Sequence, residues 1–293
     1  MKRFKTVAIY STNSGKRIKD IINHCSEVLT NLKLEVLLTE NCGVSISNSY
    51  KVYKDEVIVK KADLIISIGG DGTLLACARK FGLKGLPLLG INLGNVGFLA
   101  DLAPEDITFR LKEIVKGKYI SDQRFMLEVS LNDFKDSNFA LNEVVIHSGT
   151  VAQLIEYEVF IDQEFVYRQR ADGLIISTPT GSTAYSLSGG GPIIHPNINA
   201  ITLLPMFPHS LNSNPLLIDY DSEIQLKILD SKNKSQLSLD SQNILTVSKK
   251  DEVKMRRAQS SLILIHPEDH DFYSSCRTKL GWSIGISNKS DDL

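Results

Sequence analysis

The sequence predicts an α/β domain with a doubly wound, mostly parallel sheet, followed by a β-rich, mainly antiparallel domain. Three observations support this prediction. In the first 120 residues, short apolar segments alternate with segments of helical periodicity. From about Ile120 onward, apolar and polar residues alternate with a period of two, and few helical windows separate these runs. A length of 293 residues is also typical of about two domains.

The N-terminal elements alternate in type. A strand is predicted over Thr6–Tyr10, and a helix follows because apolar residues recur on one face between Ile18 and Leu32. The remaining elements predicted here are strands over 35–39, 64–68 and 86–91 and a helix over 104–116. In a parallel sheet of this kind, ligands bind beyond the carboxyl ends of the strands.

The C-terminal part reads mainly as strands. Residues 125–131 and 155–161 alternate at period two, and Asp162-Gln163 predicts a bend before a strand at 164–167. Further strands are predicted over 173–177, 223–229, 236–239 and 261–265, and a short helix over 271–280 that ends at Gly281 and packs back on the first domain. The predicted boundaries are 1–120 for the α/β domain, 121–268 for the β-rich domain and 269–293 for the C-terminal segment.

Composition limits the partners and the compartment. The formal net charge is −1, so no overall basic field favours nucleic acid or an anionic membrane. No run approaches the ~20 apolar residues of a membrane-spanning helix, and the N-terminus does not resemble a signal peptide. The four cysteines, Cys25, Cys42, Cys77 and Cys276, form no C-x-x-C pair. We therefore expect a cytoplasmic protein without structural zinc or disulfides.

The turn Gly69-Gly70-Asp71-Gly72-Thr73 lies between a predicted buried strand and a run of good helix formers. Backbone N–H groups in such a turn can bind phosphate oxygens. A carboxylate repels phosphate, and a role in accepting a proton from an attacking hydroxyl would explain Asp71. The structural alternative is a tight turn with Asp71 as the helix N-cap. The turn alone does not decide between the two.

Three polar clusters occur in the β-rich part. Asn142-Glu143 precedes an apolar strand, Arg170 and Asp172-Gly173 precede another, and residues 177–192 combine hydroxyls and glycines with one aromatic residue, Tyr185. Each cluster alone has a structural explanation, as a strand entrance or a Ser/Gly loop. Together they suit a nucleotide, because carboxylates and an amide can bind ribose hydroxyls and a base edge while the small residues form the walls.

Several other sites are not supported. The Walker A pattern is absent, and Gly90, Gly94 and Gly97 do not have the G-x-G-x-x-G spacing of a hydride-transfer Rossmann site. The six histidines, which are His24, His147, His195, His209, His266 and His270, lack H-E-x-x-H spacing and are expected to be core or surface residues. No dedicated metal site is expected.

The glycine–aspartate turn, the Asn142-Glu143 pair and Asp172-Gly173 followed by residues 177–185 resemble the NAD kinase family of the bacterial type, in order and in separation. The resemblance extends over nearly the whole chain. The turn alone is shared with diacylglycerol and sphingosine kinases, and a related turn occurs in 6-phosphofructokinases, so the hydroxyl-rich stretch is the discriminating part. Asp240-Ser241-Gln242 stands where members often have Asp-Gly-Gln, which leaves the backbone of that turn uncertain.

This resemblance implies transfer of the γ-phosphoryl group of ATP to the 2′-hydroxyl of the adenosine ribose of NAD, with Asp71 as the proton acceptor. Asp172 would contact the nicotinamide side, and Thr183, Ala184, Tyr185 and Ser188 the adenine. The full NAD site carried over comprises Asp71, Gly72, Phe98, Asn142, Glu143, Gln153, Arg170, Asp172, Thr183, Ala184, Tyr185, Ser186, Leu187, Ser188 and Gln242. The phosphate turn for ATP comprises Gly69, Gly70, Gly72 and Thr73.

The resemblance also implies Mg²⁺ or another divalent cation bound with ATP, and a homodimer or homotetramer. Two other functions stay open. One is a lipid kinase of the diacylglycerol or sphingosine type, for which the sequence shows no lipid-binding surface. The other is a NAD-binding regulator without catalysis, against which Asp71 argues because NAD recognition alone gains little from a carboxylate beside a phosphate turn.

Overall fold

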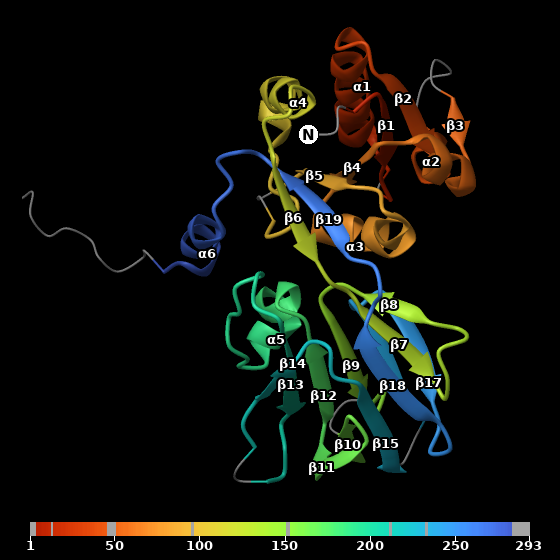
Figure 1. Cartoon of the computed structure of the whole chain (residues 1–293), viewed down its shortest axis with the longest axis vertical. Helices are drawn as coiled ribbons and strands as arrows, with labels where there is room; N and C mark the ends of the chain where they lie inside the picture. Colours follow the sequence, from red (N-terminus) through yellow and green to blue (C-terminus); the bar gives the residue numbers. More distant parts are fainter. Residues whose placement is uncertain are drawn as a thin grey trace, which may run out of the picture.

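The computed structural model describes residues 4–12, 14–45, 51–94, 97–150, 153–210, 213–231 and 234–282 (Figure 1). The chain forms an α/β half and a β half, which lie end to end in Figure 1. Among these residues no helix is long and apolar enough to cross a membrane.

The α/β half is built on a seven-stranded sheet of order β3-β2-β1-β4-β5-β19-β6. Its strands are β1 (Thr6–Tyr10), β2 (Glu35–Thr39), β3 (Val52–Tyr53), β4 (Leu64–Gly69), β5 (Leu88–Asn92), β6 (Ile120–Arg124) and β19 (Leu262–His266). All neighbours pair in parallel except β19 and β6. Every residue of β4 is buried, as expected for a central strand that is covered on both faces.

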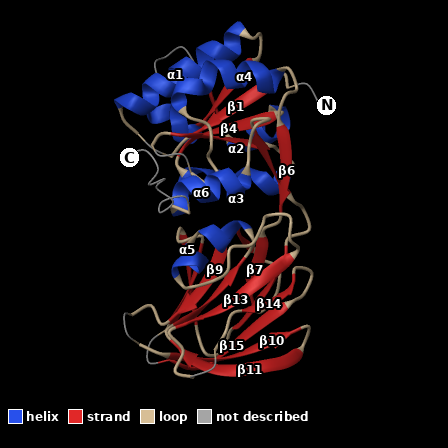
Figure 2. Cartoon of the chain, turned by 90° about the vertical axis from the view of Figure 1, so that its left-hand side faces the viewer, coloured by secondary structure: helices blue, strands red, loops and turns tan. Residues whose placement is uncertain are grey.

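Helices cover both faces of this sheet (Figure 2). The helices are α1 (Lys16–Asn31), α2 (Asp55–Lys61), α3 (Asp71–Phe81) and α4 (Ile107–Val115). The apolar residues of α1 and α4 share one core with the sheet, and those of α2 and α3 share the core on the opposite face. The second core also contains Met126, Leu141 and Ala258, so α3 packs against the β half. The predicted doubly wound fold is confirmed.

The β half consists of two six-stranded antiparallel sheets that enclose a common apolar core. One sheet has the order β11-β10-β15-β18-β7-β8, from β7 (Leu127–Leu131), β8 (Asn138–Ala140), β10 (Ile155–Ile161), β11 (Glu164–Ala171), β15 (Ile224–Ser231) and β18 (Glu252–Arg257). The other has the order β14-β13-β12-β9-β16-β17, from β9 (Glu143–His147), β12 (Gly173–Ser177), β13 (Ala200–Met206), β14 (Leu216–Asp219), β16 (Ser235–Leu239) and β17 (Asn243–Val247). The predicted antiparallel, β-rich part is confirmed, and the bend at Asp162-Gln163 has both residues at positive φ (50° and 70°).

Strand membership differs from the sequence prediction. The strand predicted at 261–265 was assigned to the β-rich domain, whereas β19 adds to the parallel sheet beside β5. The structure also has strands that the sequence analysis did not predict, which are β3, β6, β8, β13, β14, β17 and β18. Among the unpredicted strands, β13 lies between β14 and β12 and contains Pro205. Strands β6 and β19 belong to the sheet of the α/β half, although both lie within the predicted range 121–268 or at its edge. The domain boundaries at 120 and 268 remain a prediction.

The C-terminal helix α6 (Phe272–Leu280) touches both halves. Its N-cap, Asp271, accepts hydrogen bonds from the backbone N–H groups of Tyr273 and Ser274, and Gly281 ends it with a left-handed φ of 67°. Just before it, Asp269 pairs with Arg110 of α4 at 2.7 Å. The rings of Phe272 and Tyr273 pack on His195 of the β half.

Candidate functional site

The glycine-rich turn is formed where β4 ends and α3 begins. A Cβ on Gly69 would lie 2.2 Å from Oγ1 of Thr73, so only glycine lets the threonine fold back against the strand end. The Thr73 hydroxyl also lies 3.3 Å from that of Thr12, which follows β1. A Cβ on Gly70 would meet no atom within 4 Å, so the turn is open on that side.

The carboxylate of Asp71 is held by a neighbouring loop. Its Oδ2 accepts the backbone N–H of Phe98 at 2.9 Å, and its Oδ1 accepts those of Leu99 at 3.2 Å and Ala100 at 2.9 Å. A Cβ on Gly97 would lie 1.8 Å from Oδ1, so this approach also requires glycine. The helix N-cap is Gly70 and no side chain caps it, so the interpretation of Asp71 as an N-cap is wrong. A carboxylate offers about four lone-pair sites, and these three hydrogen bonds leave one on Oδ2.

A set of polar contacts connects α3 to the turn between β16 and β17. Nε2 of Gln242 donates to the carbonyl oxygen of Gly72 at 2.7 Å. Nη1 of Arg79 lies 2.8 Å from Oδ2 of Asp240, and Nη2 of Arg79 donates to Oε1 of Gln242. The structure therefore brings together Gly72 and Gln242, which the sequence predicted in one site from distant segments.

Asp240 fixes the backbone at the start of β9. Its fully buried carboxylate accepts the N–H groups of Leu141 at 3.1 Å, Asn142 at 2.8 Å and Glu143 at 3.3 Å. Sequence reasoning quoted Asp240 only as part of a turn and did not assign it or Arg79 a function. The available signal was that Asp240 stands two residues before Gln242, a predicted NAD contact.

The side chains of Asn142 and Glu143 end in buried acceptors. Oδ1 of Asn142 and Oε2 of Glu143 have no hydrogen-bond partner among the described residues. Burial, reinforced by the nearby charge of Asp240, raises the pKa of Glu143 to about 7, and the backbone N–H of Tyr185 opposes this shift by donating to its carboxylate. Buried acceptors without partners are rare in folded proteins, so we expect ligand donors here.

The hydroxyl-rich stretch uses several of its hydroxyls within the protein. Thr178 Oγ1 donates to the carbonyl of Leu141 at 2.6 Å, and Ser182 Oγ donates to that of Pro179 at 2.6 Å. A Cβ on Gly181 would lie 2.1 Å from the carbonyl oxygen of Asn142. Thr178 therefore binds the backbone beside the Asn142-Glu143 pair, whereas Ser182 binds the backbone of Pro179 and Ile194. The short helix α5 (Tyr185–Ser188) that follows leaves Tyr185 and Ser188 exposed.

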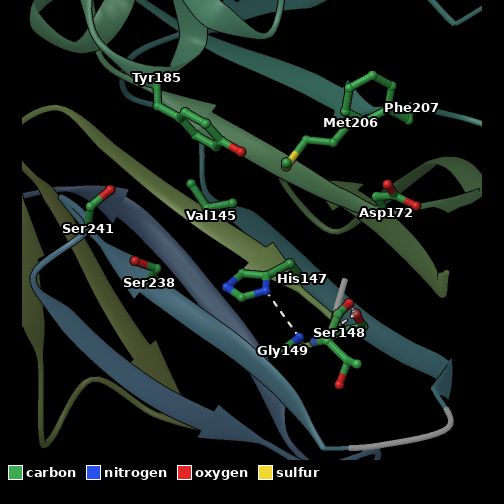
Figure 3. Close-up of a pocket in the computed structure, with 11 residues that line it drawn as sticks. Val145, His147, Ser148, Gly149, Asp172, Tyr185, Met206, Phe207, Ser238 and Ser241 are labelled. Carbon is green, nitrogen blue, oxygen red and sulfur yellow. Dashed lines mark hydrogen bonds between the residues drawn. The ribbon is translucent and has the colours of Figure 1, made fainter. Parts of the chain in front are cut away.

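A cavity of about 450 Å³ adjoins α5 (Figure 3). Ser241 lies at one end of it and Asp172 at the other, with Tyr185 and His147 between them (Figure 3). The lining residues are Val145, His147, Ser148, Gly149, Thr150, Asp172, Tyr185, Met206, Phe207, Ser238 and Ser241. The end at Ser241 adjoins Gln242, which binds Gly72, so the cavity points toward the Asp71 turn.

The structure joins most of the predicted site residues into a strip. It runs from Asp71 and Phe98 through Gly72 and Gln242 to Asn142, Glu143, residues 183–188 and Asp172. Arg170, near the end of β11, and Gln153 do not line the cavity. Sequence reasoning missed its lining residues Met206 and Phe207, because they lie on the unpredicted β13 and just after it.

One cluster of potential metal ligands occurs among the described residues: Asp101, His266 and His270. The Nδ1 atoms of both histidines lie on Oδ2 of Asp101, at 2.9 and 2.7 Å, and the rings stack at 4.0 Å with 18° between their planes. The lone pair of a histidine nitrogen lies in the plane of its ring. Because these two rings are stacked and nearly parallel, one metal ion cannot lie in both ring planes. The geometry is instead that of hydrogen bonds, which hold Asp101 directly after the loop that binds Asp71.

Comparison with known proteins gives a consistent result. Residues 12–119 match the family model of the ATP-NAD kinase N-terminal domain, and residues 141–267 match that of the ATP-NAD kinase C-terminal domain. The NAD kinase of Teredinibacter turnerae is 42% identical, over 98% of this chain and 100% of that protein. The NAD kinase of Pseudoalteromonas translucida is 41% identical, over 95% of this chain and 97% of that protein.

Two solved structures are similar over nearly the whole chain. Yeast NADH kinase complexed with NADH has a TM-score of 0.87 and 27% identity, covering 100% of this chain and 90% of that one. An NAD kinase from Archaeoglobus fulgidus in complex with ATP has a TM-score of 0.74 and 25% identity, covering 94% of this chain and 97% of that one.

Proposed function

The chain belongs to the NAD kinase family, and from this premise we propose that it transfers the γ-phosphoryl group of ATP to the 2′-hydroxyl of the adenosine ribose of NAD, giving NADP and ADP. The observation that carries this proposal is the geometry of Asp71. Three backbone N–H groups fix its carboxylate at the tip of a central strand, and one acceptor position on Oδ2 is left for a hydroxyl.

Asp71 is the proton acceptor in this proposal. Phosphoryl transfer depends mainly on alignment and charge neutralisation, and a positioned base contributes typically 10²–10⁴-fold. The three amides fix where the carboxylate lies, so the 2′-hydroxyl that donates to Oδ2 is aligned for attack on the γ-phosphorus.

The dinucleotide lies along the strip in this proposal. The unpartnered acceptors of Asn142 and Glu143 bind its hydroxyl or amine donors, and Asp172 in the cavity contacts the nicotinamide side. The adenine is lined by Thr183, Ala184, Tyr185, Ser186, Leu187 and Ser188. Phe98, Gln153, Arg170 and Gln242 make further contacts with NAD.

ATP is placed at the open side of the turn formed by Gly69, Gly70, Gly72 and Thr73. The absence of any atom within 4 Å of a Cβ on Gly70 supports close approach of phosphate there. The hydroxyl oxygen of Thr73 beside the turn is a hard donor of the kind that Mg²⁺ accepts, so the residues present fit an ion carried mainly by the phosphates. When bound, Mg²⁺ neutralises charge on the phosphate oxygens.

We also propose a cytoplasmic location and a homodimer or homotetramer. All four cysteines are free and buried, which suits a reducing compartment. The assembly follows from the family resemblance, and light scattering on the purified protein measures it.

The test is a product assay. The purified protein is incubated with ATP and Mg²⁺ plus either NAD or diacylglycerol, and NADP is detected with an NADP-specific dehydrogenase. We expect NADP with NAD and no phosphorylated lipid. Phosphatidic acid without NADP would identify a lipid kinase, and neither product would identify a NAD-binding regulator; either result would overturn the proposal.

A further inference from the structure

Lys279 of α6 reaches the loop that holds Asp71. Its Nζ donates to the carbonyl oxygen of Gly97 and lies 4.3 Å from the centroid of the Phe98 ring. Gly97 is the residue whose Cβ would overlap the carboxylate of Asp71, and Phe98 donates its N–H to that carboxylate. A half-buried ammonium therefore binds the two residues that contact the proposed base.

The charges around Lys279 come from three places. Burial lowers its pKa, whereas Asp71 of α3, Asp101 at the end of the loop and the neighbouring Cys276 thiol raise it. Asp101 is itself bound by His266 and His270. Lys279 is thus partly desolvated, and the carboxylates that favour its charged form are those of the loop and of Asp71.

A cation beside Asp71 needs an explanation. A nearby positive charge favours the ionised form of a carboxylate and so weakens it as a proton acceptor. The cation is not needed to hold Asp71, because three amides already do so. It gains a function when the charged oxygens of a phosphoryl group arrive next to the carboxylate.

The cations on α3 itself are already engaged. Arg79 pairs with Asp240 at 2.8 Å, and Lys80 pairs with Asp55 at 2.7 Å. Lys279, by contrast, uses one of its three ammonium donors on Gly97, and two are left for a ligand.

We propose that Lys279 is a further catalytic residue, whose ammonium binds oxygens of the phosphoryl group in transfer beside Asp71. The inference rests on the proposed function. In the step, a bond forms between O2′ of the ribose and the γ-phosphorus, the bond from that phosphorus to the β–γ bridging oxygen breaks, and the hydroxyl proton passes to Asp71. Lys279 keeps its proton and neutralises charge on the oxygens that do not react.

The experiment compares Lys279→Met and Lys279→Arg with Arg277→Met, a matched control two residues away on the same helix. Arg277 is exposed, and its ion-pair partner among the described residues is Asp271, the N-cap of α6. Removing one donor of this kind costs about 10²–10³ in kcat. We expect Lys279→Met to lose about that much kcat with the KM for NAD unchanged, and Arg277→Met to match the wild type.

The arginine variant separates catalysis from packing. A guanidinium stays charged above pH 12, so the alkaline fall of kcat/KM for ATP should move to higher pH in Lys279→Arg even where its maximum is reduced. Thermal unfolding of each variant reports folding. A Lys279→Met enzyme with kcat within about threefold of wild type, or a Lys279→Arg profile with an unmoved alkaline limb, would overturn the inference. Formation of NADP by the wild type in the same assay keeps that result separate from a failure of the proposed function.

Discussion

Asp71 and Glu143 are carboxylates from different halves of the molecule, and the protein holds them differently. Asp71, at the tip of β4, accepts three backbone N–H groups spread over both oxygens. Glu143, at the start of β9, accepts the N–H of Tyr185, and its Oε2 is buried with no partner among the described residues. The parallel half supplies a fixed acid with one open lone pair, whereas the antiparallel half supplies acceptor capacity that a ligand must fill.

This contrast follows from the two architectures. The end of a parallel strand is met by the next loop along the sheet, and here the loop after β5 aims consecutive amides at Asp71. In the β half, the consecutive amides at the start of β9 bind Asp240 instead, and the side chain of Glu143 accepts the N–H of Tyr185. Chemistry therefore belongs to the first half in our proposal and dinucleotide recognition mainly to the second.

The largest effect should come from removing the fixed acid. In Asp71→Asn the amide nitrogen would face a backbone N–H, so one hydrogen bond of the loop is lost together with the base. We expect kcat to fall by about 10²–10⁴-fold, with NAD affinity within a few-fold of wild type. Steady-state kinetics and calorimetric NAD titration measure the two quantities, and Asp20→Asn on the exposed face of α1 is the control. Near-normal kcat would show that Asp71 is not the base.

The next largest effect should come from removing the ion pair between Arg79 and Asp240, which connects the two halves. Arg79→Met leaves the fully buried carboxylate of Asp240 without its cation, and breaking such a pair costs about 3–5 kcal/mol. Three amides still bind Asp240, so we expect a loss near 3 kcal/mol, the lower end of that range, in urea unfolding. Lys80→Met, which removes a more exposed pair with Asp55, should cost about 0–1 kcal/mol. Equal losses in the two variants would show that the Arg79–Asp240 pair does not stabilise the site.

The sequence was sufficient for features that depend on neighbours along the chain. The strand–turn–helix around Asp71, the fold class of both halves and the resemblance to the NAD kinase family are all confirmed. Each rests on local periodicity or on motifs whose residues are close in sequence.

The features that were missed depend on contacts across long separations. Asp240 binds amides 97 to 99 residues away, and Lys279 binds a carbonyl 182 residues away. The burial that raises the pKa of Glu143 also arises only when distant segments close over it. No periodicity encodes these contacts. They depend on which strands pair and on where the loops then meet.

The pH dependence of stability should sharpen the contrast between the two acids. The pKa of Glu143 rises from 4.5 to about 7 on folding, so the native state binds its proton more tightly than the unfolded chain. This contribution is fully present below pH 4.5 and is lost as the pH rises to 7, at a cost of roughly 3 kcal/mol at most. In Glu143→Gln this loss should disappear, so the variant gains relative to wild type between pH 5 and 8 in urea unfolding. Glu27→Gln, on an exposed helix face, is the control, and a constant difference from wild type across this range would contradict the assignment.

The smallest effect should come from the turn that joins the halves. Asp240 and Ser241 both have left-handed backbone conformations, with φ of 49° and 55°. In this conformation a residue with a Cβ is strained by roughly 1–2 kcal/mol relative to glycine. Glycine relieves that strain, but its greater freedom in the unfolded chain costs about 0.4–1 kcal/mol of stability. We therefore expect Ser241→Gly to stabilise the protein by roughly 0.5–1 kcal/mol, without changing kcat, because the side chain of Gln242 still binds Gly72. Ser238→Gly, in strand β16 of the same cavity wall, should instead destabilise by about 0.5–1 kcal/mol. If both glycines destabilise equally, the turn is not strained by serine, and the positions of Asp240 and Gln242 must be set by their contacts with Arg79 and Gly72 alone.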